Sequence, residues 1–180
     1  MRVIAGTARS VPLKTLDGLA TRPTTDRVKT SLFNIIQFQI EGRTVLDLFA
    51  GSGALGIEAL SRGAESAVFV DQSEQALAVV RENLQKTRLL DRAEPVRAEA
   101  ISYLQNCKKR FDLIFLDPPY AENLLENALK CISEIDILKS GGIIICERPV
   151  EKPGCGVYPG LQASKDYRYG KTVISLYRKE

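Results

Sequence analysis

The stretch "DLFAGSGALG", residues 47–56, decides the fold class of this 180-residue chain. Its glycines, Gly51, Gly53 and Gly56, have the G-x-G-x-x-G spacing of the turn that joins a strand to a helix in Rossmann-like folds. Glycine lets the backbone turn sharply and lets a ligand approach it closely. We therefore expect an adenosine-carrying cofactor at this turn.

Short apolar runs alternate with helical patterns from Thr44 onward, which is typical of a parallel sheet covered by helices on both faces. The expected strands are "TVLDLF", "SAVFVD", "EPVRA", "DLIFLD" and "GIIICE". Near the end of the chain, "LQASKDY" and "KTVISLYRK" alternate as strands do, and a turn at "RYG" would join them into an antiparallel edge. The sequence predicts an α/β, Rossmann-like fold with a mostly parallel, seven-stranded sheet.

The residues before the first strand form a separate pattern. Apolar residues on either side of "AGTARS" predict a hairpin, and "TTDRVKTSLFNIIQF" predicts a helix capped by Thr24 or Thr25. The chain is too short for a second full domain. We therefore expect residues 1–40 to be an extension without independent stability, joined to one domain of residues 41–180.

Composition excludes several kinds of site. The chain has no histidine, which excludes Ser-His-Asp and Cys-His nucleophile arrangements. Its four cysteines, Cys107, Cys131, Cys146 and Cys155, form no C-x-x-C pair, so we expect neither a metal site nor a disulfide framework. No signal peptide and no run of about 18 apolar residues is present, so we expect a cytoplasmic protein without a membrane partner.

Charge is distributed unevenly along the chain. Residues 1–43 carry a net charge of +4, residues 44–150 carry −4 and residues 151–180 carry +3. The basic ends either reflect ordinary scatter of surface charge or form a rim that meets nucleic-acid phosphates. On the second interpretation, the N-terminal phosphate-binding candidates are Arg2, Arg9, Lys14, Arg22, Arg27 and Lys29.

Asp47 indicates which adenosine-carrying cofactor binds. A carboxylate at the end of the first strand would repel the pyrophosphate of a nicotinamide or flavin cofactor. It suits S-adenosylmethionine, which has an ammonium group and a sulfonium and no phosphate. Asp71, at the end of "VFVD", is placed to bind a ribose diol, as in either cofactor class. Glu99 either accepts a hydrogen bond from the adenine amine or is a solvated loop acid.

The segment "DLIFLDPPY" indicates the reaction. Its strand delivers Asp117, Pro118, Pro119 and Tyr120 to the edge of the sheet where the glycine turn lies. The Asp117 carboxylate and the Pro118 carbonyl can accept hydrogen bonds from an exocyclic base amine, and Tyr120 can stack on the base. The alternative interpretation is a plain turn that ends a strand. The combination with Asp47 and the glycine turn favours methylation of a base amine.

These motifs resemble those of the bacterial methyltransferases that modify the N2 amine of a guanine in 16S ribosomal RNA. The resemblance covers nearly the whole chain and includes "MRVIAG", "TRPTTDRVKTSLFNI", "VLDLFAGSGALGIEAL", "FLDPPY" and "YGKTVISLY". It implies a class I methyltransferase fold, S-adenosyl-L-methionine as cofactor, and 16S rRNA within an assembled or nearly assembled small subunit as substrate.

The resemblance also assigns residues. It implies that Asp117, Pro118, Pro119 and Tyr120 hold the target base. The implied cofactor-binding residues are Asp47, Phe49, Ala50, Gly51, Gly53, Asp71, Gln72, Glu99 and Ala100. Residues 1–40 would then be the RNA-docking hairpin and helix, and a deletion of residues 1–18 would weaken RNA binding while sparing the cofactor.

Two alternatives remain. A DNA adenine-N6 methyltransferase uses the same loop chemistry but usually carries a separate target-recognition region, for which this chain has little room. A non-catalytic nucleic-acid-binding protein could retain the fold without activity, but the intact Asp47 and "DPPY" argue against it. A titration with the cofactor would distinguish the last case.

Overall fold

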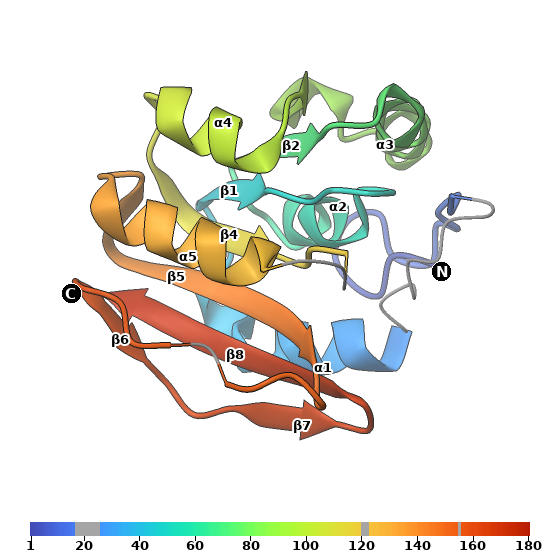
Figure 1. Ribbon diagram of the computed structural model, residues 1–180. Helices are drawn as coiled ribbons and strands as arrows, with labels where there is room; N and C mark the ends of the chain where they lie inside the picture. The colour runs from blue at the N-terminus through green and yellow to red at the C-terminus, as the bar shows by residue number, and fades with distance from the viewer. Residues whose placement is uncertain (17–25, 120–122, 155) are drawn as a thin grey trace.

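The computed structural model describes residues 1–16, 26–119, 123–154 and 156–180, and it consists of one mixed sheet between two layers of helices (Figure 1). The sheet has eight strands in the order β3-β2-β1-β4-β5-β8-β6, and β7 pairs with β8. The strands are β1 (Thr44–Asp47), β2 (Ser66–Asp71), β3 (Ala93–Arg97), β4 (Phe111–Leu116), β5 (Leu138–Pro149), β6 (Leu161–Ala163), β7 (Tyr167–Tyr169) and β8 (Thr172–Lys179).

Strands β1 to β5 are parallel, and β8 pairs antiparallel with β5, as the sequence predicts. The sheet has one strand more than expected, because the stretch "LQASKDY" and the adjoining turn form two short strands, β6 and β7, that both pair with β8. The order in which strands are added reverses between β1 and β4: β2 and β3 lie on one side of β1, and β4 and β5 lie on the other. Ligands of open α/β sheets bind at the carboxyl ends of the strands beside such a switch point.

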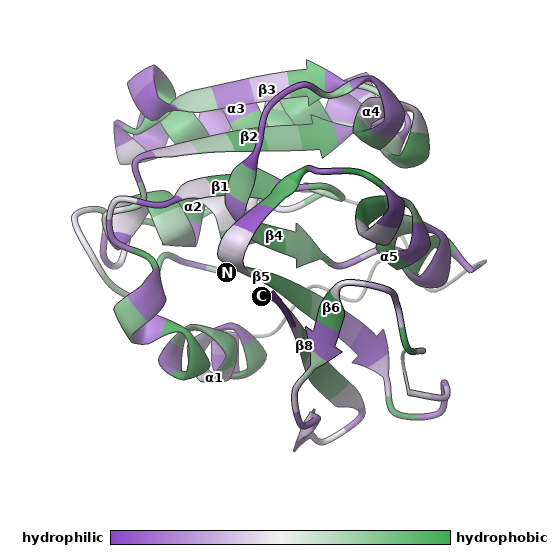
Figure 2. Cartoon of the chain, turned by 90° about the vertical axis from the view of Figure 1, so that its left-hand side faces the viewer, coloured by the Kyte–Doolittle hydropathy of each residue, from purple (hydrophilic) through white to green (hydrophobic). Residues whose placement is uncertain are grey.

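The helices are α1 (Asp26–Ile35), α2 (Ala54–Ser61), α3 (Glu74–Thr87), α4 (Ala100–Asn106) and α5 (Leu124–Glu134), with 3₁₀ turns at Gln37–Gln39 and Leu90–Arg92. In Figure 2, α1 and α2 lie on one side of the sheet, and α4 and α5 lie on the other. Alternate residues of β4 enter different cores: Leu113 and Phe115 pack with the first pair of helices, and Ile114 and Leu116 with the second. Burial on both faces explains why the strands are continuous apolar runs.

The N-terminal segment, residues 1–16, pairs less regularly than the hairpin that the sequence predicts. The N–H of Val3 donates to the carbonyl of Val11 at 3.0 Å, but the only ladder contact between these described residues is one isolated bridge, Arg2 to Pro12. Helix α1 begins at Asp26, and its expected caps, Thr24 and Thr25, lie outside the described residues. Val3 and Leu32 belong to the same buried cluster as the sheet residues, so the N-terminal segment shares the core.

Three expected absences concern the described part of the chain. Cys107, Cys131 and Cys146 are free thiols. No group of three or more His, Cys, Asp or Glu residues within that part could hold a metal ion. None of its helices is both long enough and apolar enough to span a bilayer.

Candidate active site

A cavity of about 590 Å³ lies at the carboxyl edge of the sheet. The glycine turn, the residues that follow β2, β3 and β4, and the N-terminal segment form its walls. In Figure 1 the carboxyl ends of β1, β2 and β4 point to the right. The predicted residues that line the cavity are Asp47, Phe49, Ala50, Gly51, Asp71, Gln72, Glu99, Ala100, Asp117, Pro118 and Pro119. Gly53 does not line the cavity, and Tyr120 lies outside the described residues.

Asp47 is the most buried acid of this cavity, with 2% of its surface exposed. One carboxylate oxygen accepts the N–H of Gly56 at 3.0 Å. Burial raises the pKa of Asp47 from 3.8 to about 7, and the nearby carboxylates of Asp117 and Asp71 add to this effect. A buried carboxyl with an elevated pKa in a cavity is well suited to pair with a cationic ligand group.

Asp112 provides a contrast at the opposite edge of the sheet. Although its burial raises the pKa of the carboxyl, hydrogen bonds from Thr44, Lys139 and Arg43 outweigh burial and lower the pKa to about 2. The Arg43 and Lys139 nitrogens lie 3.2 and 3.0 Å from its oxygens. The fold therefore compensates this carboxylate with its own cations, whereas it leaves Asp47 without a described cationic partner among the cavity residues.

The glycine turn has the geometry that its spacing predicts. Gly51 and Gly53 have φ angles of +54° and +80°, which disfavour other residues. Gly56 serves helix packing, because a Cβ at this position would lie 2.4 Å from the Phe69 ring of β2. The turn thus brings α2 close to the sheet and its backbone close to the cavity. Gly53 contributes through this backbone conformation and is the N-cap residue of α2, since the N–H of Ile57 donates to its carbonyl at 2.9 Å.

Asp71 and Glu99 are both held by backbone N–H groups. Asp71 accepts hydrogen bonds from Gly51 at 3.0 Å and from Ser73 at 2.9 Å, so it bridges the glycine turn and the start of α3. Glu99 caps α4, because its oxygens accept from Ile101 at 3.0 Å and from Ser102 at 2.8 Å. The sequence did not indicate this cap, since Glu is not a favoured N-cap residue. Both side chains still line the cavity, so each can offer its remaining lone pairs to a ligand.

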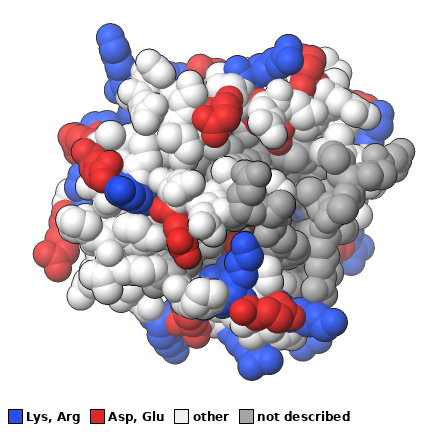
Figure 3. Space-filling view, viewed as in Figure 1, with Lys and Arg blue, Asp and Glu red and all other residues white. Residues whose placement is uncertain are grey.

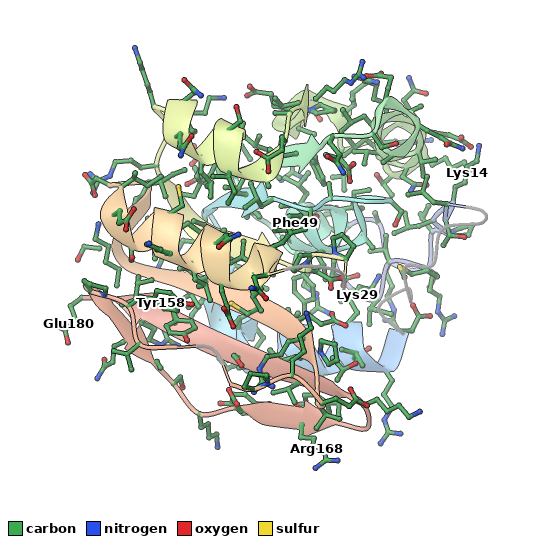
Figure 4. All side chains as sticks on the ribbon, viewed as in Figure 1. Lys14, Lys29, Phe49, Tyr158, Arg168 and Glu180 are labelled. Atoms are coloured by element: carbon green, nitrogen blue, oxygen red, sulfur yellow. The ribbon has the colours of Figure 1, made fainter. Side chains whose placement is uncertain are left out.

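The "DPP" loop lies beside the glycine turn because β1 and β4 are adjacent and parallel. Asp47 is paired in register with Phe115, which places Asp117 just beyond the end of β1. Phe49 lies between α4 and α5 in Figure 4 and packs against their apolar cluster. The predicted acids of the two strands therefore share one cavity with an aromatic wall.

The sequence did not indicate that the N-terminal segment contributes to this cavity. Met1, Thr15 and Leu16 line it, as do Leu48, Ser52, Ala54, Leu55, Ser73, Ala76, Ala98 and Leu124. The residues from Leu48 onward could have been inferred from their proximity to the motifs. Met1, Thr15 and Leu16 could not, because they lie more than thirty residues before the glycine turn.

The basic candidates divide into two kinds. Arg2, Arg9, Lys14 and Arg27 are exposed, and Arg22 lies outside the described residues. Two of the exposed side chains also have acidic neighbours: Arg2 lies 3.9 Å from Asp26, and the Lys14 ammonium lies 2.7 Å from Glu82. On the face shown in Figure 3, Lys and Arg side chains lie mainly around the periphery.

The structure corrects the prediction that Lys29 binds RNA. Its side chain is 0% exposed, and its ammonium lies 3.3 Å from a carboxylate oxygen of Glu58 and donates to the carbonyl of Arg2 at 2.5 Å. Burial lowers the pKa of Lys29, while Glu58 opposes this shift. Figure 4 shows Lys29 inside the molecule. Because Glu58 also accepts from the N–H groups of Ile4 and Ala5, this pair fastens α1 and the N-terminal segment to α2.

Residues 1–178 match the family described as "Conserved hypothetical protein 95". The chain is 44% identical over 184 residues to "Putative rRNA methyltransferase YlbH" of Bacillus subtilis, with 99% of each chain covered. It is 33% identical over 180 residues to "Ribosomal RNA small subunit methyltransferase D" of Escherichia coli, with 100% of this chain and 90% of that protein covered. The solved structure of "Putative methyltransferase yhhF from Escherichia coli" matches with a TM-score of 0.90 at 30% identity, covering 100% of this chain and 98% of that one. The chain therefore belongs to the methyltransferase family described as Conserved hypothetical protein 95.

Proposed function

We propose that this protein transfers a methyl group from S-adenosylmethionine to the exocyclic N2 amine of a guanine in 16S rRNA. The observation that carries this proposal is the convergence of Asp47 and the Asp117–Pro118–Pro119 loop on one cavity. The relatives named ribosomal RNA small subunit methyltransferase D support an RNA substrate. The N2 position of guanine rests on the resemblance of the whole set of motifs.

The residues of the cavity fit this cofactor. Its described lining includes the acids Asp47, Asp71, Glu99 and Asp117 and no Lys or Arg side chain, which suits an ammonium and a sulfonium and disfavours a pyrophosphate. Asp47 would bind the ammonium, Asp71 the ribose hydroxyls and Glu99 the adenine amine. Phe49, Ala50, Gln72 and Ala100 would form the walls. Bound S-adenosylmethionine supplies an electrophilic methyl group on its sulfonium.

The "DPP" loop would hold the target amine. The lone pair of an exocyclic base nitrogen is delocalised into the ring, which makes the nitrogen a weak nucleophile. Hydrogen bonds from its two N–H groups to the Asp117 carboxylate and the Pro118 carbonyl would favour a tetrahedral nitrogen. Tyr120 would stack on the base. Since the nitrogen becomes strongly acidic only after methylation, histidine is not required to remove its proton.

Residues 1–40 would dock the RNA, which would lie within an assembled or nearly assembled small subunit in the cytoplasm. The exposed Arg2, Arg9, Lys14 and Arg27 would contact phosphates, which carry affinity rather than sequence information. A guanine in a loop or bulge can reach the cavity once it leaves its stack.

A transfer assay tests the proposal. Labelled S-adenosylmethionine is incubated with small subunits from cells that lack this protein, and nucleoside analysis identifies the modified base. Asp117→Ala should abolish transfer and bind S-adenosylhomocysteine within about twofold of wild type, since its contact is with the base. The control is Asp91→Ala, because Asp91 is an exposed carboxylate that does not line the cavity. Methyladenine in DNA as the product, or normal turnover by Asp117→Ala, would contradict the proposal.

The docking role needs a test other than deletion of residues 1–18. That deletion would remove Val3 and Leu13 from the core and Thr15 from the cavity, so it would not spare the cofactor. The double variant Arg2→Ala/Arg9→Ala leaves those positions intact. It should weaken RNA binding and flatten the slope of log affinity against log salt by about 0.7–0.9 for each lost phosphate contact. An unchanged slope would show that these two side chains do not contact the RNA.

A further inference from the structure

Asn83 connects two parts of the cavity wall that are distant in sequence. It lies on α3, is 0% exposed, and does not itself line the cavity. Its amide oxygen accepts the N–H of Lys14 at 2.8 Å. Its amide nitrogen donates to the carbonyl of Lys14 at 3.0 Å and to the carbonyl of Ser52 at 2.9 Å. Asn83 therefore binds the N-terminal segment and the glycine turn at the same time.

The chemistry of the amide suits this arrangement. An asparagine side chain offers one acceptor and two N–H donors on a planar group, and all three functions are used. Two of the bonds go to the backbone of a single residue, Lys14, as they would between neighbouring strands. The third goes to Ser52, which lies between Gly51 and Gly53 and lines the cavity. A buried aspartate or leucine could not make the same three bonds.

Lys14 directly precedes residues that line the cavity, so its bonds to Asn83 bear on ligand binding. The next two residues, Thr15 and Leu16, line the cavity, and Figure 4 shows Lys14 beside α3 at the edge of the molecule. The Lys14 side chain reaches Glu82 at the surface, so only its backbone takes part in the connection to Asn83. A ligand that fixes the glycine turn therefore also favours the position of residues 14–16 against the cavity, and the reverse holds equally.

We propose that Asn83 is a positioning residue of the cofactor site, which couples S-adenosylmethionine binding at the glycine turn to closure of residues 14–16 over the cavity. The inference rests on the proposed use of this cofactor.

The test compares variants of Asn83 with two controls. Asn83→Asp keeps the shape and the acceptor for the Lys14 N–H, but it places oxygen against two carbonyls. Thr87→Val is the control for stability, because Thr87 is buried on the same helix and its hydroxyl donates to the carbonyls of Asn83 and Leu84 within that helix. Glu82→Gln is the control for the Lys14 side chain, because it removes the ion pair with Lys14 while the backbone bonds to Asn83 remain.

Two measurements are made on folded protein, with S-adenosylhomocysteine as the probe. By calorimetry, Asn83→Asp should bind the probe about tenfold more weakly, within the usual range of coupling between sites, while both controls stay within about twofold of wild type. By hydrogen exchange, the probe should slow exchange of the Leu13 and Lys14 amides in the wild type and in both controls, and not in Asn83→Asp. If Asn83→Asp does not fold, Asn83→Ala takes its place with the same expectations.

The outcomes separate this inference from the proposed function. If wild type and Asn83→Asp bind the probe equally, or if Thr87→Val loses as much affinity, the coupling is wrong while the cofactor assignment stands. If wild type binds no S-adenosylhomocysteine, the proposed function fails and this inference fails with it.

Discussion

Replacement of Asp47 by asparagine separates the stability of the free protein from its affinity for the cofactor. The pKa of Asp47 rises from 3.8 to about 7 because the carboxyl is buried. Ionisation of this carboxyl therefore destabilises the folded state: the penalty is absent below the unfolded pKa, grows between the two values and is complete above about pH 7. Three pH units correspond to an upper bound of about 4 kcal/mol.

Asparagine has the same shape as aspartate and no charge, so Asp47→Asn removes this penalty. A buried amide also requires an acceptor, and we therefore expect about half of the upper bound, or about 2 kcal/mol at pH 8. For a chain of this length that gain raises Tm by roughly 4–8 °C. Calorimetric unfolding near pH 8 and near pH 5 checks this, since the gain should be less than half as large at the lower pH. A variant that melts below wild type near pH 8, or shows the same gain at both values, would refute the reasoning.

The affinity of the same variant should change in the opposite direction. On the proposed role of Asp47, the ligand ammonium loses a charge-assisted partner, so S-adenosylhomocysteine should bind roughly tenfold to 100-fold more weakly. In the wild type the proton must leave Asp47 on binding, so affinity should fall by up to about tenfold per pH unit below pH 7 and level off above it. Titration calorimetry across this range measures both effects. A profile that is equally flat for wild type and Asp47→Asn would remove Asp47 from the ammonium site.

Two substitutions test how the site is supported. Gly56→Ala places a Cβ 2.4 Å from the Phe69 ring, so it should cost about 1–3 kcal/mol in the free energy of unfolding. The control Gly154→Ala should be close to neutral, because its Cβ would lie no closer than 3.8 Å to any described atom outside the neighbouring residues. Equal melting temperatures for these two variants would contradict the close packing of α2. Lys29→Met should destabilise the protein by roughly 3 kcal/mol, because it leaves the buried Glu58 with fewer partners, and should leave the salt dependence of RNA binding unchanged. A flatter slope for the folded variant would restore Lys29 to the RNA surface.

The sequence by itself determined the features that depend on local pattern. The order of strands and helices followed from alternating apolar runs, because strands buried on both faces must be continuously apolar. Asp47, Asp71 and Asp117 could be assigned to one edge from the chain alone, because each lies at the end of a strand of the same parallel sheet. The glycine turn could be assigned because positive φ angles restrict Gly51 and Gly53 to glycine.

Tertiary structure alone decided which charged and polar side chains face solvent, ligand or core. Lys29 shares a helical face with the buried Leu32 and Phe33. Its burial as a cation depends on Glu58, which lies on another helix and has no signal in the local sequence. The hydrogen bonds of Asn83 join it to Lys14, 69 residues away in the chain, and to Ser52, 31 residues away. A hydrogen bond between distant residues depends on where packing places them, and sequence periodicity records only which face of its own helix or strand a residue occupies.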